Sequence, residues 1–333
     1  MTVNTSIPPQ AQDRPLVSFI ILTYKQPAFV RSAVQSALDQ DYSPLEIIVS
    51  DDCSPDNTYE VVAELLRDYR GPHQVTLRRN PQNMGIARHF AEVLARTHGE
   101  LVIASGGDDD SLPERTRVTV DAWLAHDRRP DMIACDVIDM DQDGQCHGTL
   151  HVDDLARYKD IGDWAAAPPR IIGAALAWSR RMITAHPTLP EGLTHEDQLG
   201  VVRAILGHGG ITLRTPLVKY RRGGISRHLQ LDTGAALRRK LLFDARNDWL
   251  FLSQVLLEAG DRMPEQHARR LRKLAGRARH ILDLETAGLL RTVLLTLYSP
   301  HADLSFRLRS LMHLRASSLI AALNRLKQAR RKH

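Results

Sequence analysis

Cysteine is scarce in this chain of 333 residues, and long apolar runs are absent. The three cysteines (Cys53, Cys135 and Cys146) form no CxxC pair, which argues against a disulfide framework and against a thiolate metal site. No uninterrupted apolar run approaches the roughly 20 residues of a membrane-spanning helix, because Arg291 interrupts the run at residues 289–298. The N-terminal residues hold no basic segment followed by an apolar one, so we expect no signal peptide. These absences predict a cytoplasmic protein.

The glycine-rich loops that bind nucleotides in many parallel sheets are also missing. No GxGxxG follows the first predicted strand, where the loop at residues 23–27 has no glycine. No GxxxxGK[ST] occurs anywhere in the chain. These absences argue against the two commonest kinds of nucleotide site in a parallel sheet.

Charge is distributed unevenly along the chain. Residues 235–333 hold 20 Lys and Arg against 8 Asp and Glu, a net charge of +12. Residues 1–234 hold 24 against 31, a net charge of −7. The overall net charge of +5 therefore combines an acidic body with a strongly basic C-terminal part, and the two need separate explanations.

Short apolar, β-branched runs alternate with helical patterns in the first part of the chain. Strands are predicted at residues 16–23, 45–50, 74–79 and 101–105, and helices at 27–40, 56–69 and 85–97. This alternation is typical of an α/β fold with a parallel sheet. A helix to about residue 126, a strand at 131–139, a helix at 196–206 and a strand at 211–220 follow, and the pattern is helical from Thr233 onward.

Acidic side chains follow the second predicted strand, and open α/β sheets bind ligands where their strands end. Asp51 and Asp52 could accept hydrogen bonds from a base N–H or a ribose hydroxyl. An equal alternative is that Ser54 or Asp56 caps the next helix and that the other carboxylates are solvated.

Three consecutive carboxylates, Asp108, Asp109 and Asp110, follow the fourth predicted strand. A divalent cation, Mg²⁺ or Mn²⁺, would relieve their mutual repulsion and bridge a diphosphate. The alternative is a capping box of Ser111 and Glu114 at the next helix, which leaves the three aspartates unexplained. The sequence therefore predicts a metal site here.

Five segments occur in the order and at roughly the spacing found in a known family: VSFIILTYKQ, IIVSDDCSPDNT, NPQNMGIARH, GGDDDSLPERT and THEDQLG. Over about residues 15–228 the chain resembles the inverting family 2 glycosyltransferases with the GT-A fold. The resemblance implies a Rossmann-like, mostly parallel sheet with helices on both faces. Its expected parts are a flexible N-terminus (1–14), a GT-A domain (15–232) with a nucleotide-sugar half (15–112) and an acceptor half (113–232), and a basic helical region (233–333).

The resemblance also implies roles for individual residues. The nucleotide-sugar pocket would be formed by Thr23, Tyr24, Asp51, Asp52, Asn83, Gly85, Arg88, Asp108, Asp109 and Arg227. The DxD motif of the family corresponds to Asp108 and Asp110, which would hold the divalent cation together with His228. Many members read D-A-D-D here, and this chain has Gly106 where their first Asp stands.

The catalytic base implied by the resemblance lies in the THEDQLG segment. Inversion needs a carboxylate that deprotonates the acceptor hydroxyl as it attacks the anomeric carbon opposite the leaving nucleotide. Asp197 is the predicted base, and Glu196 would position it or the acceptor. The alternative, which is compatible with this role, is that Thr194 caps the helix and both acids favour its N-terminal dipole.

The basic C-terminal part places Leu, Ile and Phe at helical spacing between Arg and Lys. One interpretation is a set of basic amphipathic helices on an anionic membrane surface. The other is a helical bundle that packs on the catalytic body or on a second copy in a homo-oligomer. No recognition motif or aromatic platform supports nucleic-acid binding, and Phe, Trp and Tyr make up only 5% of the chain.

Together, the residues and the resemblance predict a metal-dependent inverting glycosyltransferase. It would transfer a sugar from a nucleotide-diphosphate sugar to a saccharide or lipid-linked saccharide, in the synthesis of cell-surface polysaccharide or glycoconjugate. It would act in the cytoplasm or at the inner face of the membrane. The alternative is a non-catalytic GT-A-like protein that assists other polysaccharide enzymes at the membrane.

Overall fold

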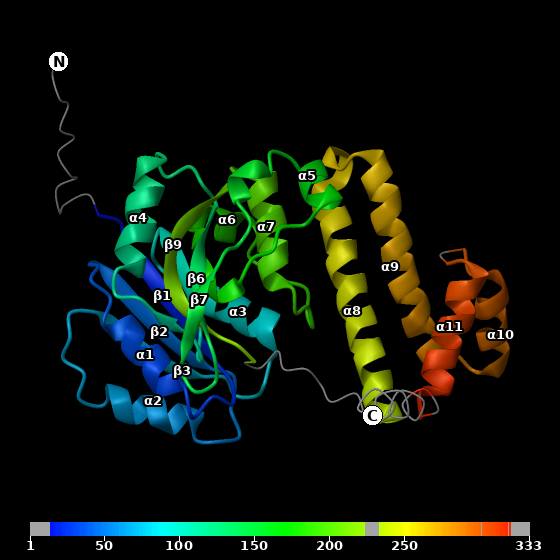
Figure 1. Cartoon of the computed structure of the whole chain (residues 1–333), viewed down its shortest axis with the longest axis horizontal. Coiled ribbons are helices and arrows are strands. Elements are labelled where there is room, and N and C mark those ends of the chain that lie inside the picture. Colours follow the sequence, from blue (N-terminus) through cyan, green and yellow to red (C-terminus); the bar gives the residue numbers. More distant parts are fainter. Residues whose placement is uncertain (1–13, 224–232, 301, 319, 321–333) are drawn as a thin grey trace, which may run out of the picture. The chain divides into compact units, whose positions relative to one another are not determined.

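The computed structural model describes residues 14–223, 233–300, 302–318 and 320. They fall into two compact units (Figure 1). The α/β unit comprises the chain up to Glu191 together with Glu196–Ile225, and the helical unit comprises Gly192–His195 and the chain from Ser226 onward. The predicted flexible N-terminus, apart from Arg14, lies outside the described residues, as do Arg227 and His228.

The α/β unit begins with four parallel strands connected by helices. The strands are β1 (Val17–Thr23), β2 (Leu45–Asp51), β3 (Gln74–Arg79) and β4 (Leu101–Gly106), and the helices are α1 (Val30–Leu38), α2 (Thr58–Leu66) and α3 (Ile86–Leu94). Strand β1 lies between β2 and β4, and β2 pairs with β3. The carboxyl ends of β1, β2 and β4 therefore meet at one edge of the sheet, as the sequence predicts.

The second half of this unit extends the sheet with strands of both directions. Its elements are β5 (Asp110–Ser111), α4 (Arg115–Ala125), β6 (Met132–Met140), β7 (Cys146–Leu150), η2 (Leu155–Arg157), α5 (Ile161–Ala166), η3 (Gly173–Ala175), β8 (Leu176–Ser179), α6 (Arg180–Ala185), α7 (Glu196–Leu206) and β9 (Gly210–Arg221). The described sheet has nine strands in the order β3-β2-β1-β4-β8-β6-β9-β5, with β7 on β6. Strand β8 runs antiparallel to β4 and β6, whereas β6 and β9 are parallel.

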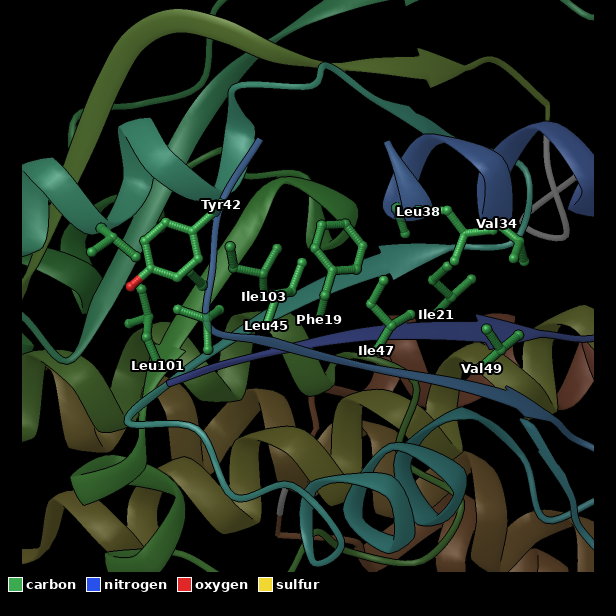
Figure 2. Close-up of a cluster of buried hydrophobic side chains, with 14 of the residues drawn as sticks. Phe19, Ile21, Val34, Leu38, Tyr42, Leu45, Ile47, Val49, Leu101 and Ile103 are labelled. Atoms are coloured by element: carbon green, nitrogen blue, oxygen red, sulfur yellow. The ribbon is translucent and has the colours of Figure 1, made fainter. Parts of the chain in front are cut away.

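Helices cover both faces of the sheet, because successive side chains of a strand point to opposite faces. Phe19 and Ile21 of β1 and Ile47 of β2 share one buried cluster with Val34 of α1. Figure 2 shows these side chains filling the space between α1 and the two strands. On the opposite face, the ring of Phe90 in α3 packs edge-on against Trp178 of β8, with 5.0 Å between ring centroids.

Helix α7 approaches the sheet closely because Gly200 has no side chain. A Cβ atom at Gly200 would lie 2.4 Å from the Trp178 ring, well inside van der Waals contact. The glycine thus lets α7 lie directly on β8. The first turn of α7 contains the predicted catalytic base, Asp197, and the acid before it, Glu196.

The helical unit contains α8 (Gly234–Ala259), η4 (Gly260–Arg262), α9 (Glu265–Thr286), α10 (Leu289–Tyr298) and α11 (Leu304–Arg315). Ala245, Ala278 and Leu284 form the centre of its core, together with Leu314. The short segment Gly192–His195 packs on α8: the backbone nitrogen of Thr194 donates to Oδ1 of Asn247 over 3.0 Å, and the His195 ring meets Phe251. Within the described residues we find no helix with the length and apolar character needed to cross a bilayer.

Most predicted elements are confirmed, and the predicted capping box is wrong. Glu114 occupies the N-cap position of α4 without a side-chain cap. Ser111 lies instead in strand β5, opposite Val218, and its hydroxyl accepts a hydrogen bond from Arg115. The buried guanidinium of Arg115 also donates to the carbonyls of Ala104 and Ala174, so Ser111 is part of a network that joins β4, β5 and η3.

Candidate active site

The carboxyl ends of β1, β2 and β4 are in direct contact. Oγ1 of Thr23, at the end of β1, lies 3.3 Å from Oδ1 of Asp51, at the end of β2. Gly107, which follows β4, packs on Thr23 and on Gln26: a Cβ atom at Gly107 would lie 2.8 Å from Thr23 Cγ2 and 2.6 Å from Gln26 Oε1. A residue with a side chain at Gly107 would separate the three strand ends. Tyr24, next to Thr23, is partly exposed at this edge.

Asp51 and Asp52 are buried and accept hydrogen bonds from the loops around them. Asp51 accepts from the backbone nitrogen of Ser54 and pairs with Nε of Arg79 at 3.3 Å. Asp56 accepts from the backbone nitrogen of Thr58, the first residue of α2, at 3.1 Å, so the predicted capping by Asp56 is confirmed. The solvated state that the same alternative expects for Asp51 and Asp52 is wrong, because both are buried. The buried carboxylate of Asp51 therefore holds the turn after β2 through the backbone nitrogen of Ser54.

Asp52 holds the loop that follows β3. Its Oδ1 accepts from Met84 and its Oδ2 from Gly85, both through backbone nitrogens at 2.9 Å. Nδ2 of Asn83 lies 3.3 Å from the Asp52 carbonyl. Gly85 has a φ of 74°, which favours glycine, and it forms the N-cap of α3. The structure thus brings Asp52, Asn83 and Gly85 together, and Arg88 lies exposed in the first turn of α3.

The acidic segment after β4 is largely buried. Burial and the charge of Asp108 raise the pKa of Asp109 to about 7, and burial raises the pKa of Asp108. Oδ1 of Asp110 is a buried oxygen that has no hydrogen-bond partner in the part of the chain described. Oδ1 of Asp108 and Oδ2 of Asp109 each lie 2.9 Å from the point that a Cβ atom at Gly106 would occupy. Only glycine fits there without moving both carboxylates.

This oxygen-rich segment fits a divalent cation. Mg²⁺ and Mn²⁺ prefer carboxylate oxygens, and sites of this kind use one or two carboxylates together with substrate phosphates. The unpartnered Asp110 oxygen and the crowding of Asp108 against Asp109 are what such an ion would relieve. Within the described ranges, no group of three or more Asp, Glu, His or Cys side chains is arranged as a complete metal site. The predicted third ligand, His228, lies outside those ranges.

Arg221, at the end of β9, lies against the acidic segment. Its backbone nitrogen donates to Oδ1 of Asp109, and its Nε donates to the carbonyl of Asp108 at 3.0 Å. The guanidinium also lies 4.5 Å from the ring centroid of Phe29. No role was predicted for Arg221 from the sequence, because its contacts with the acidic segment depend on strand pairing between β5 and β9.

Glu196 and Asp197 lie next to each other in the first turn of α7. Burial and the charge of Asp197 raise the pKa of Glu196 to about 8, so Glu196 is mostly neutral at pH 7. Oδ1 of Asp197 accepts from the backbone nitrogen of Gln198 at 2.7 Å. Oδ2 of Asp197 lies 3.4 Å from the point that a Cβ atom at Gly173 would occupy, in ordinary contact distance.

Tyr220 lies next to the acidic segment, because its neighbours Lys219 and Val218 pair with Asp110 and Ser111. Burial raises its pKa, and so do the charges of Asp109, Asp108 and Asp197. Its ring packs against a buried cluster that includes Leu217 and Val218. No site role was predicted for Tyr220 from the sequence.

Comparisons with known proteins indicate a family that this chain resembles. Residues 18–164 match the model of Glycosyl transferase family 2. A putative teichuronic acid biosynthesis glycosyltransferase, TuaG of Bacillus subtilis, is 33% identical over 96 residues, which cover 29% of this chain and 37% of TuaG. The chain spans less than half of the length of the curated relatives it matches, from 18% to 46%.

Two solved structures share the fold. The mannosyltransferase PcManGT from Pyrobaculum calidifontis, in complex with GDP-Man and Mn²⁺, has a TM-score of 0.54 at 16% identity, covering 94% of this chain and 87% of that one. Residues 1–349 of TarS from S. aureus, in complex with UDP-GlcNAc, have a TM-score of 0.51 at 17% identity, covering 92% of each chain. At these identities the likeness shows the fold alone, which is the GT-A architecture expected from the sequence.

Proposed function

Because residues 18–164 match the model of Glycosyl transferase family 2, we propose that this chain transfers a sugar from a nucleotide-diphosphate sugar to an acceptor hydroxyl with inversion. The observation that carries this proposal is the crowded acidic segment after β4, where Oδ1 of Asp110 is buried without a partner in the described residues. This segment would hold the cation for a donor diphosphate, and Asp197 in the first turn of α7 would be the base for an acceptor. Single-displacement transfer requires both.

The donor would bind at the three strand ends. The loop after β1 contributes Thr23 and Tyr24, and the loops that Asp51 and Asp52 hold contribute the backbone around Asn83 and Gly85. In this proposal the two buried aspartates act mainly by fixing those loops. Arg88, exposed at the start of α3, and Arg227 would meet the negative charge of the nucleotide.

A divalent cation would be held by Asp108 and Asp110, with Asp109 beside them and His228 as a further ligand. Such an ion neutralises negative charge on the departing diphosphate. The unpartnered buried oxygen of Asp110 supports this assignment. Arg221 keeps the segment in place through Asp108 and Asp109. The PcManGT complex with Mn²⁺ supports the use of an ion by a protein of this fold.

Asp197 would take the proton of the acceptor hydroxyl as the acceptor oxygen attacks the anomeric carbon and the bond to the nucleotide diphosphate breaks. Glu196, neutral near pH 7, would donate a hydrogen bond to the acceptor or to Asp197 rather than compete as a base. The hydroxyl of Tyr220 would orient the groups between the two sets of acids.

The acceptor is proposed to be a saccharide or lipid-linked saccharide in the synthesis of a cell-surface polysaccharide or glycoconjugate. The similarity to TuaG, named for teichuronic acid biosynthesis, supports this setting. We place the protein in the cytoplasm, with peripheral attachment to the inner face of the membrane. The competing function is a non-catalytic partner of polysaccharide enzymes, which the complete set of acids at the site argues against.

The test is a thermal-shift screen of UDP- and GDP-sugars with Mn²⁺ on the full chain, followed by an assay of nucleotide release with and without saccharide acceptors. Release of UDP or GDP that depends on Asp197 supports the transferase. Binding of a nucleotide sugar without turnover under any acceptor condition would favour the non-catalytic alternative. The anomeric configuration of the product, read by NMR, decides between inversion and retention.

A further inference from the structure

Helix α10 carries its apolar side chains on the outside of the helical unit. Leu289, Leu290 and Tyr298 are 75–86% exposed, and Val293, Leu294 and Leu297 are about half exposed. These six side chains account for most of the ten-residue helix. Exposed apolar groups on this scale mark an interaction surface, because scattered single leucines are ordinary and clusters are not.

The inward face of α10 is mostly polar. Thr292 and Thr296 are its buried residues. Their hydroxyls donate to backbone carbonyls of the same segment, Thr292 to Ala287 at 3.4 Å and Thr296 to Thr292 at 2.8 Å. Leu295 is the one leucine of α10 that packs against the core of the unit. Packing within the unit therefore does not explain the six exposed apolar side chains, which reverse the usual distribution of an amphipathic helix.

Helix α11 adds a second apolar stripe. Leu304, Leu308 and Met312 recur every four residues, so they share one face of the helix, and each is about half exposed. Ser310 and Leu314 are the buried residues of α11. Helices α10 and α11 contact each other in the helical unit. We call the nine exposed apolar side chains of the two helices the outer apolar face.

The positive charge of α10 and α11 indicates the kind of surface that they could bind. The two helices contain no Asp or Glu and four arginines, Arg291, Arg307, Arg309 and Arg315. Nε and Nη1 of Arg307 are buried, so the arginines available to a partner are Arg291, Arg309 and Arg315, which are exposed. Arg315 donates to the carbonyl of Ala287 at 3.4 Å, and within the described ranges none of these three forms an ion pair with an acid. Asp303, just before α11, is already paired with Arg277 at 2.7 Å. A surface that complements these helices must be apolar in its interior and negatively charged at its edge.

We propose that the outer apolar face of α10 and α11 docks on a lipid bilayer with anionic headgroups. The apolar side chains would enter the acyl boundary, and the arginines would reach the phosphates of the headgroups. A second copy of the chain fits less well, because two such faces would bring arginines together without an acid to neutralise them. This inference rests on the proposed peripheral localisation and names its surface, and it uses no part of the transfer chemistry.

The test is co-sedimentation of the full chain, without nucleotide sugar, with vesicles of phosphatidylcholine and phosphatidylglycerol (3:1) or of phosphatidylcholine alone. The wild type is expected to bind the anionic vesicles and to be released by salt. Leu290→Glu/Leu297→Glu should lower the partition coefficient by about tenfold or more, because the variant lacks two leucines that would be buried in the bilayer. The matched control, Phe243→Glu/Leu257→Glu, adds the same charge at exposed sites on α8 and should change binding by about threefold or less.

Three outcomes overturn the proposal. They are no binding of the wild type to the anionic vesicles, equal losses in the two double variants, and a change from dimer to monomer in Leu290→Glu/Leu297→Glu with vesicle binding intact. Light scattering measures the oligomeric state for the last outcome. A change from dimer to monomer with vesicle binding intact would mean that the outer apolar face binds a second copy of the chain. Circular dichroism checks the fold of each variant. If a variant does not fold, the binding of the wild type to anionic vesicles compared with phosphatidylcholine vesicles still tests the proposal. Nucleotide release is assayed separately, so failure of the transferase proposal leaves this result intact.

Discussion

The backbone nitrogen of Arg221 donates a hydrogen bond of 2.9 Å to Oδ1 of Asp109, a residue 112 positions earlier in the chain. This bond joins the end of β9 to the acidic segment after β4. The side chain of Arg221 strengthens the connection through the carbonyl of Asp108. Tyr220, one residue before Arg221, is therefore fixed beside the acids proposed to bind the donor.

Replacing Tyr220 with Phe should lower the kcat of transfer by about tenfold and leave the fold intact. The ring keeps its packing against the cluster that includes Val218. Only the hydroxyl is lost, whose pKa the charges of Asp109, Asp108 and Asp197 raise. Steady-state kinetics and a thermal melt measure the two effects. Tyr158→Phe is the control, since the charges that raise the pKa of Tyr158 come from Asp153 and Asp163. Equal kinetics for Tyr220→Phe and the wild type would remove Tyr220 from the site.

Asp197→Asn should reduce turnover by about 10²–10⁴-fold, the usual contribution of a general base. The affinity for the donor nucleotide should change little, because Asp197 is assigned to the acceptor. Glu196→Gln is the matched variant: Glu196 is already mostly neutral at pH 7, so its amide should cost less than about tenfold. Nucleotide release and calorimetry read the two quantities. A larger loss in Glu196→Gln than in Asp197→Asn would exchange their roles.

Asp108→Asn and Asp110→Asn should each remove the increase in nucleotide affinity that Mn²⁺ provides. The expected loss is about tenfold or more, because a carboxylate ligand contributes charge that an amide lacks. Calorimetry with UDP or GDP, in Mn²⁺ and in EDTA, measures it. Asp143→Asn, at an exposed turn between β6 and β7, serves as the control. Unchanged Mn²⁺ dependence in both variants would place the ion elsewhere.

His89 should make the α/β unit less stable in mild acid. Its ring lies 2.6 Å from the hydroxyl of Ser50 and is buried, and burial lowers its pKa to about 4 from an ordinary value of 6.5. The unfolded chain therefore binds a proton between pH 6.5 and 4 that the folded chain does not. The free energy of unfolding should fall as the pH drops through this range, by about 3 kcal/mol in total.

Urea unfolding at several pH values measures this dependence. His89→Gln keeps a hydrogen-bonding group near Ser50 but does not titrate, so its stability should vary less between pH 6.5 and 4. The same slope in the variant and the wild type would assign the acid sensitivity to other groups.

Gly107→Ala should destabilise the protein by about 2 kcal/mol, because a methyl group there would overlap Thr23 and Gln26. It should also weaken nucleotide binding, since the ends of β1 and β4 would move apart. Gly288→Ala has open space around its Cβ position and should change stability by less than about 0.5 kcal/mol. Chemical unfolding followed by tryptophan fluorescence compares the two. Normal stability in Gly107→Ala would mean that the strand ends adjust without cost.

The sequence predicted the parallel strands well because their signals are local. Residues of β1 such as Phe19 and Ile20 are buried on opposite faces, which produces an uninterrupted apolar run. Strand β5 has two residues and β8 has four, too few to show any period. The capping prediction at Ser111 failed because its spacing to Glu114 is local, whereas the hydroxyl is used by Arg115 and the backbone by β9.

The residues of the candidate site also divide into those with a local sequence signal and those that depend on contacts between distant segments. Asp51, Asp52 and Asp108–Asp110 could be found because each follows a predicted strand. Tyr220 and Arg221 could not, because their importance arises from the pairing of β5 with β9 over more than 100 residues. The sequence also could not show that Asp51 and Asp52 bond mainly to loops of the protein itself.

The segment Gly192–His195 belongs to the helical unit although the chain on both sides of it belongs to the α/β unit. Thr194 and His195 pack on α8 immediately before Glu196 and Asp197. A chimera that exchanged only the residues after Ile225 with a relative would pair a foreign α8 with these four native residues. Exchange of the segment and the helices as one cassette would keep both matched, so recombination experiments that seek a new acceptor preference should move them together.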